Sequence, residues 1–209
     1  MTSPNRHRKP GAILGALLAA PLLLSGCASG GQPTSAYDFG PVPPLAAPAA
    51  PHPLQALIVA DVNGPASLDT EHMQYRLLYA DARQSRPYAY NQWTTTPLQL
   101  LTQRLKARIA QAGVKVLSST DAATSIALLR IEVDDFAQTF DSATHSSGHI
   151  GLRASVFRGH QLVDQKTFER SSPAPTPDAA GGAHALADSS DALAADILAW
   201  LAALPPQRN

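Results

Sequence analysis

The chain has 209 residues, and its 16 basic side chains balance its 16 acidic ones, so its formal net charge is zero. The basic residues form no continuous stripe, which argues against a nucleic-acid partner. The chain contains one cysteine, so an intrachain disulfide is excluded, and the length is that of one domain with an ordinary hydrophobic core.

Residues 1–26 have the pattern of an export signal. Arg6, Arg8 and Lys9 precede an apolar run over residues 12–24, and small residues follow that run. The run is shorter than the roughly 20 apolar residues that a permanent membrane-spanning helix needs. We expect the segment to be removed. Its removal takes away three of the 16 basic residues. The mature chain would then have 13 basic and 16 acidic residues, a net charge of −3 with neutral histidine.

The cysteine directly follows this segment. Leu24-Ser25-Gly26-Cys27 resembles the lipobox of bacterial lipoproteins, whose thiol is alkylated with a diacylglyceryl group and whose new N-terminus is acylated, with palmitate as the expected chain. Two or three acyl chains make membrane attachment effectively permanent. The resemblance implies that Cys27 is the lipidated first residue of the mature chain. A plain signal peptide with a chance cysteine is the alternative.

Residues 27–53 are expected to form a lipidated tether and linker. Ala28 follows the cysteine in place of the aspartate that favours inner-membrane retention. The lipoprotein resemblance therefore implies the periplasmic face of the outer membrane. Residues 41–53 are rich in proline and alanine and favour extended conformations. Before them, residues 37–40 predict a short edge strand that ends at Gly40.

The first half of the segment 54–204 reads as strands and one helix. Residues 54–62 are apolar on both faces, which predicts a central strand covered on both sides, and residues 73–80 alternate as a second strand. Thr96 and Pro97 predict the start of a helix that Gly113 ends. Its faces other than the leucine-rich one carry Arg104, Lys106 and Arg108. A short strand over 114–117 follows.

The second half predicts an antiparallel meander and a last helix. Residues 125–136, 149–157 and 161–168 alternate, and a Gly-led hairpin turn separates the last two. Residues 171–182 are expected to be a mobile loop before an amphipathic helix over 186–204, and residues 205–209 form a tail. These elements predict an α+β fold, a single mixed, mainly antiparallel sheet with two main helices packed on it.

Histidines and carboxylates offer weak candidates for chemistry. His145 and His149 lie four residues apart, but in a loop-to-strand context with no third metal ligand fixed by spacing. Asp134 and Asp135 point to opposite faces of a strand unless a bulge intervenes. We therefore assign no catalytic residue, no metal site and no cofactor, and a solvated loop is the reading preferred for the histidines.

Aromatic residues and arginine are the side chains that protein interfaces favour. Tyr88 and Tyr90 are candidates for partner contact, because the segment 81–90 contains a proline and reads as a loop, and loops carry function more often than core positions. Arg76, the arginine among these aromatic residues, is the third candidate. Core packing is the preferred reading for Tyr75 and Trp93.

The ordered set of motifs resembles one family, the ABC-type transport auxiliary lipoprotein component family, which includes the lipoprotein of the paraquat-inducible operon. The set comprises the lipobox, the tyrosine-containing strand at 37–41, a Pro-x-x-Leu-Asp turn at 65–69, Tyr75-Arg76, Trp93 before a leucine-rich helix, and Trp200 in a late helix. The proline-rich insert after Gly40 and the segment 81–90 are individual to this chain.

The resemblance implies a membrane-anchored periplasmic protein without catalytic activity. It would work beside a mammalian-cell-entry (MCE) domain protein, an ABC permease and an ATPase that move lipids or other hydrophobic molecules between membranes. A homo-oligomer is compatible with such a docking role. Two alternatives stay open, a structural lipoprotein of another envelope assembly machine and a periplasmic enzyme that uses the region of His145 and His149.

Overall fold

The computed structural model describes residues 2, 32–44, 53–121 and 126–204. By its internal contacts the chain divides into Met1–Pro33 and Thr34–Asn209, and the fold described below is that of the second unit. Cys27, the tail at 205–209 and, apart from residue 2, the predicted signal segment lie outside the described residues.

The second unit contains twelve described elements. In chain order they are β1 (Ser35–Tyr37), β2 (Ala56–Val59), η1 (Ala66–Leu68), β3 (His72–Leu77), α1 (Leu78–Asp81), β4 (Ala82–Trp93), α2 (Pro97–Gln111), β5 (Lys115–Leu117), β6 (Leu128–Phe140), β7 (Ser146–Arg158), β8 (Gln161–Pro173) and α3 (Ala179–Ala203).

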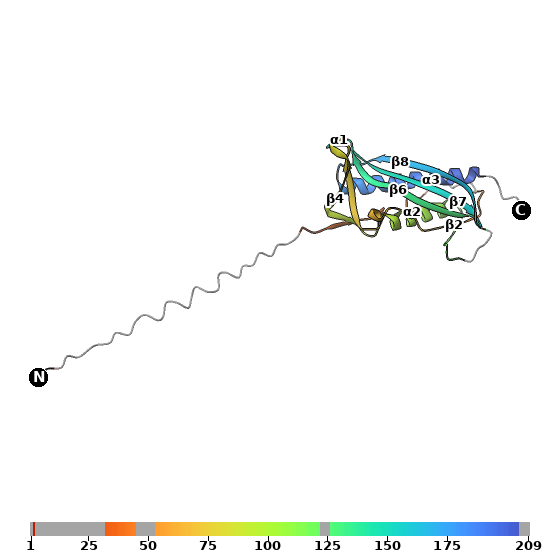
Figure 1. Cartoon of the computed structure of the whole chain (residues 1–209), viewed down its shortest axis with the longest axis horizontal. Coiled ribbons are helices and arrows are strands. Elements are labelled where there is room, and N and C mark those ends of the chain that lie inside the picture. The colour runs from red at the N-terminus through yellow and green to blue at the C-terminus, as the bar shows by residue number, and fades with distance from the viewer. Residues whose placement is uncertain (1, 3–31, 45–52, 122–125, 205–209) are drawn as a thin grey trace. The chain divides into compact units, whose positions relative to one another are not determined.

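The eight described strands form one sheet that is organised around β6 (Figure 1). One side of β6 pairs with β7 along its length, and β7 pairs with β8, both antiparallel. On its other side β6 pairs in parallel with β2 near its start and with β3 near its end. β3 pairs with β4 antiparallel, β4 with β1 parallel, and β2 with β5 parallel. The predicted fold class is confirmed, because the long pairings are antiparallel and the short ones parallel.

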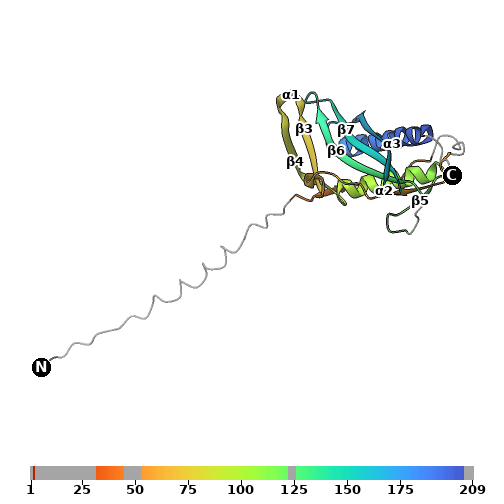
Figure 2. The same ribbon diagram turned by 45° about the vertical axis from the view of Figure 1, so that its right-hand side comes forward.

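Helices α2 and α3 pack on one face of this sheet and bury its apolar side chains (Figure 2). Before the bulge in β6 the inward residues are Leu129, Ile131 and Val133, and their partners on β7 are equally buried. The aromatic rings of Phe39, Trp93 and Phe136 meet in the same core at centroid distances of 5.8–6.2 Å. Phe39 therefore fixes the segment after β1 to the folded unit.

An ion-pair cluster joins the two helices. Asp191 on α3 accepts hydrogen bonds from the guanidinium of Arg104, with Nε–Oδ1 2.6 Å and Nη2–Oδ2 2.9 Å, and also from Arg108. Burial favours the neutral acid, but the bonds from Arg108 and Arg104 outweigh it and lower the pKa of Asp191. Arg104, predicted on a face other than the leucine-rich one, is only 5% exposed because that face packs against α3.

Several sequence predictions are confirmed at their special residues. Thr96 caps α2 by accepting from the Gln99 N–H, and Gly113 ends the segment with a φ of 85°. Gly159 has a φ of 58° in the β7–β8 turn. The edge strand lies slightly earlier than predicted, at Ser35–Tyr37, and pairs with the end of β4.

Three predictions need correction. The segment 81–90 is not a loop, because β4 runs from Ala82 to Trp93 and pairs with β3. The predicted strand 73–80 ends at Leu77, and α1 follows it. The predicted loop 171–182 is short, because β8 extends to Pro173 and α3 begins at Ala179 behind the cap Asp178.

The described helices do not include one that combines the length and the apolar character of a membrane span.

Candidate docking surface

Tyr88 lies on β4 and is held inside the fold. Its ring stacks against Tyr75 at a centroid distance of 4.7 Å, and its hydroxyl donates to Oε1 of Gln138 over 2.8 Å. Burial raises the pKa of Tyr88 above its ordinary value, and the neighbouring Tyr75 and Asp178 add to the shift. The phenol is therefore a neutral donor whose hydrogen already has a partner.

Gln138 is the centre of this network and is almost fully buried. Its Nε2 donates to Oγ of Ser146 over 2.9 Å and to the backbone oxygen of Asp178 over 3.0 Å. The amide thus connects β4, β6 and β7 to the residue that caps α3. A buried amide with its hydrogen bonds satisfied stabilises a specific arrangement of the elements around it.

The structure does not bring the three predicted contact residues together. The register pairs Tyr75 with Arg86 and Arg76 with Ser85, so Arg76 points to the opposite face of the sheet from Tyr75 and Tyr88. Tyr90 is half exposed and is the most accessible of the three. Of these candidates, Tyr90 offers the largest free surface to a partner.

Arg76 belongs instead to a loose cluster with Asp135 and His149. The Arg76 guanidinium lies 3.8 Å and His149 Nε2 lies 3.9 Å from the Asp135 carboxylate. A register shift between Val133 and Asp135 marks a bulge in β6. A bulge is the feature that Asp134 and Asp135 would need in order to face the same side of the strand. His145 lies apart, hydrogen-bonded to Ser142 and Thr144 in the turn before β7.

The described residues show no group of three His, Cys, Asp or Glu side chains that could hold a metal ion.

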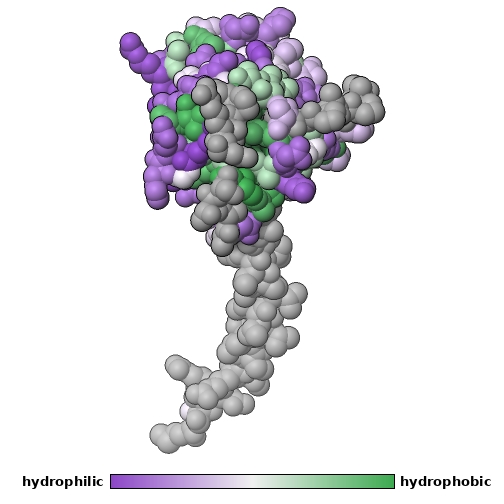
Figure 3. Space-filling model, turned by 90° about the vertical axis from the view of Figure 1, so that its right-hand side faces the viewer, coloured by the Kyte–Doolittle hydropathy of each residue, from purple (hydrophilic) through white to green (hydrophobic). Residues whose placement is uncertain are grey.

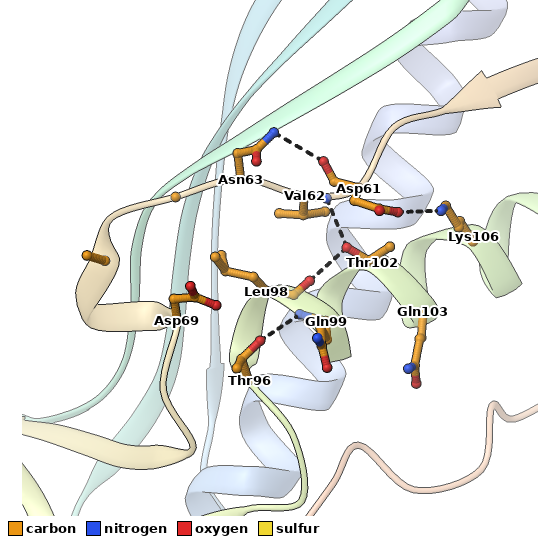
Figure 4. Close-up of a pocket in the computed structure, with 12 residues that line it drawn as sticks. Asp61, Val62, Asn63, Asp69, Thr96, Leu98, Gln99, Thr102, Gln103 and Lys106 are labelled. Atoms are coloured by element: carbon orange, nitrogen blue, oxygen red, sulfur yellow. Dashed lines mark hydrogen bonds and ion pairs between the residues drawn. The ribbon is translucent and has the colours of Figure 1, made fainter. Parts of the chain in front are cut away.

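An open groove of about 710 Å³ lies between the start of α2 and the segment that follows β2 (Figure 4). Thr102 of α2 connects the helix to the segment after β2. Its hydroxyl accepts a hydrogen bond from the Val62 N–H over 2.9 Å and donates one to the Leu98 backbone oxygen over 2.8 Å. Lys106 and Asp61 form an ion pair of 2.7 Å at the rim. The groove presents amides, hydroxyls and this ion pair, which can form hydrogen bonds with a ligand or a partner.

Large apolar side chains are exposed at two ends of the folded unit. Leu78 and Tyr79 lie on α1 at the end of the β3–β4 ribbon, and Leu162 lies near the β7–β8 turn. Figure 3 shows the end opposite to α1, where hydrophobic clusters alternate with hydrophilic side chains. The predicted strand 73–80 included Leu78 and Tyr79, so their exposure as an apolar pair was not predicted. The signal was the run Leu77-Leu78-Tyr79, because adjacent apolar residues cannot all face one side of a strand.

The comparisons with known proteins assign the family. The model of the ABC-type transport auxiliary lipoprotein component family matches residues 37–198, so the chain belongs to this family. No protein with curated function matches the chain.

Two solved structures show the same fold. A crystal structure of a protein from Xanthomonas campestris is similar with a TM-score of 0.65 and 19% sequence identity, over 81% of this chain and 92% of that one. A crystal structure of an uncharacterized protein has a TM-score of 0.64 and 19% identity, over 81% of this chain and 99% of the other. These likenesses support the sheet and helix arrangement described above.

Proposed function

We propose that this protein is a lipid-anchored docking component of an ABC transport system that moves lipids between the two membranes. The match of the auxiliary lipoprotein family over residues 37–198 carries the proposal. In this proposal Cys27 holds the protein at the periplasmic face of the outer membrane. The folded unit contacts the MCE-domain protein, and through it the permease and ATPase, without catalysing a reaction.

We expect the partner to be contacted through Tyr90, and not through Arg76, which lies on the opposite face of the sheet from Tyr88. Tyr90 is half exposed on β4, whereas the hydroxyl of Tyr88 is engaged by Gln138. Aromatic side chains contribute most to binding when a partner buries them fully. A partner strand or loop that covers Tyr90 would gain this contribution without disturbing the core.

In-cell crosslinking tests the proposal. A photo-crosslinking amino acid at position 90 is expected to capture the MCE-domain protein, and the same amino acid at Leu162, which is equally exposed, serves as the matched control. Capture of a component of another envelope assembly machine at position 90 would support the alternative of a structural lipoprotein. Equal capture from both positions would contradict a specific docking role for Tyr90.

The anchor is tested separately. Cys27→Ser is expected to abolish diacylglyceryl addition and the cleavage that depends on it, which intact-mass measurement of the purified protein detects. Normal processing and membrane retention of this variant would contradict the lipid anchor. The enzyme alternative predicts that His145→Ala and His149→Ala together abolish function in cells without loss of folding, whereas the docking proposal predicts that they do not.

A further inference from the structure

The end of the β3–β4 ribbon exposes an apolar pair on a short turn of helix. Leu78 is 46% exposed and Tyr79 is 54% exposed, and α1 has no buried residue. All residues from 78 to 85 are exposed. Figures 1 and 2 both place α1 at the end of the ribbon, where β3 and β4 meet. We call residues 76–86 the ribbon tip.

Positively charged residues flank this apolar pair in the sequence. The ribbon tip contains Arg76, Arg83 and Arg86 and one acidic residue, Asp81, in a mature chain whose expected net charge is negative. Arg86 donates to the neutral side-chain amide of Gln84, so its charge is not compensated there. Arg83 has no ion-pair partner among the described residues, and Asp81 accepts from its backbone N–H. Of the three arginines, Arg76 alone forms an ion pair among the described residues, with the Asp135 carboxylate at 3.8 Å.

The size of the tip favours a membrane surface over a protein partner. A stable protein interface buries about 1,200–2,000 Å² in total, and a four-residue helix with two large apolar side chains supplies only a small part of that area. A lipid surface needs only shallow insertion of an apolar pair, with arginines at the phosphate level and tyrosine at the interface. The excess of cationic side chains is complementary to anionic phospholipids.

Chain length keeps the tip within reach of the membrane that holds the anchor. The eight residue steps from Cys27 to Ser35 span at most about 29 Å. The nine steps of β4 from Ala82 to Asn91, the partner of Ser35, span about 30 Å. These two lengths are nearly equal, so the tip meets the membrane surface that holds Cys27 when the ribbon is inclined to that surface. Tethering also raises the effective concentration of a weak second contact.

We propose that the ribbon tip is a second membrane contact, in which Leu78 and Tyr79 insert among anionic phospholipids and Arg83 and Arg86 bind their phosphate groups. The inference rests on the proposed lipid anchor for its setting. Two attachment points would fix the orientation of the folded unit on the membrane and present the same face to a partner each time.

A labelled cysteine tests the contact in the anchored protein. Once Cys27 is lipidated, the cysteine of Leu78→Cys is the free thiol for an environment-sensitive fluorophore, and Leu162→Cys is the matched control at 48% exposure near the β7–β8 turn. In vesicles of phosphatidylethanolamine and phosphatidylglycerol, the label at 78 is expected to shift to the blue and to be quenched by lipids with brominated chains. The label at 162 is expected to remain water-exposed. A water-exposed label at 78 would overturn the proposal.

Flotation of the unanchored mature chain with Cys27→Ser separates the tip from the anchor. Arg83→Gln is expected to lower partitioning onto the same vesicles about fivefold, whereas Lys115→Gln, an exposed cation on β5, leaves it unchanged. Equal losses for both variants would overturn the tip as the contact. A missing diacylglyceryl group on the native protein would refute the proposed anchor. The flotation result would then still decide whether the ribbon tip binds the membrane. A photo-crosslinker at position 79 that captures a protein in cells and no lipid would also overturn it.

Discussion

Tyr88 donates its phenolic hydrogen to Oε1 of Gln138 over 2.8 Å, and Gln138 in turn donates to the backbone oxygen of Asp178, the cap of α3. Tyr88 and Asp178 are far apart in the sequence, so this chain of bonds connects the β3–β4 ribbon to the start of the last helix. It also assigns Tyr88 a structural role that its neighbour Tyr90 does not share.

We expect Tyr88→Phe to lower the free energy of unfolding by about 1 kcal/mol, because the variant keeps the ring stacking and leaves Oε1 of the buried Gln138 without its donor. Tyr90→Ser is expected to leave stability within about 0.5 kcal/mol of the parent. Urea denaturation of the two variants measures the difference. Equal stability of the two would show that the hydrogen bond contributes nothing.

Asp191 is expected to be the most important acidic residue for the α2–α3 interface. Asp191→Asn leaves the guanidinium of Arg104, 5% exposed, without its counter-charge, and should lower the free energy of unfolding by about 2–3 kcal/mol. Asp196→Asn, which breaks the exposed pair with Arg170, is the matched control and should cost much less. Thermal unfolding of both variants gives the comparison, and similar losses would contradict the role of burial.

The same carboxylates predict acid sensitivity. The Gly181 N–H and the Thr176 hydroxyl lower the pKa of Asp178, and the two arginines lower that of Asp191. Because the folded-state pKa lies below the unfolded value of about 3.9, the stability they contribute is present above that pH. It is lost as pH falls through the folded-state pKa. We expect the free energy of unfolding to fall less steeply with decreasing pH in Asp191→Asn than in the parent. Denaturation measured downward from about pH 6, roughly two units above the unfolded pKa of an aspartate, tests this.

Local sequence signals predicted the elements that begin or end at residues with a strong conformational preference. Thr96 and Gly113 mark the ends of α2 because one side chain caps a helix and the other accepts a positive φ. The alternation in β6 and β7 predicts their buried face because one side of the sheet is covered by helices.

The errors arose where distant segments decide the conformation. Pro87 indicated a loop, yet it lies in β4, which is an edge strand at this position because β1 pairs only with residues 91–93, and edge strands tolerate proline. Gly181 and Gly182 indicated a loop as well, although they lie in α3. The burial of Arg104 was not predicted, because its partner, Asp191, is 87 positions away and cannot be identified from helical spacing.

Gly148 on β7 sets the distance between the sheet and α3. A Cβ at this position would lie 2.5 Å from the Leu186 nitrogen and 2.6 Å from the Ala185 carbonyl carbon, and both are backbone atoms that cannot rotate away. Gly148→Ala must therefore push α3 off the strand and stretch the bond from the Ser189 hydroxyl to the Gly148 oxygen, now 2.7 Å.

We expect this substitution to lower the free energy of unfolding by about 2–3 kcal/mol. Gly151→Ala on the same strand is the matched control, because its Cβ would make an ordinary contact at 3.8 Å with Glu169, and its effect should stay within about 0.5 kcal/mol. Chemical denaturation of both variants distinguishes a close helix–strand contact from a general intolerance of alanine in β7. If Gly148→Ala were as stable as Gly151→Ala, the close approach of α3 to the sheet at this point would be refuted.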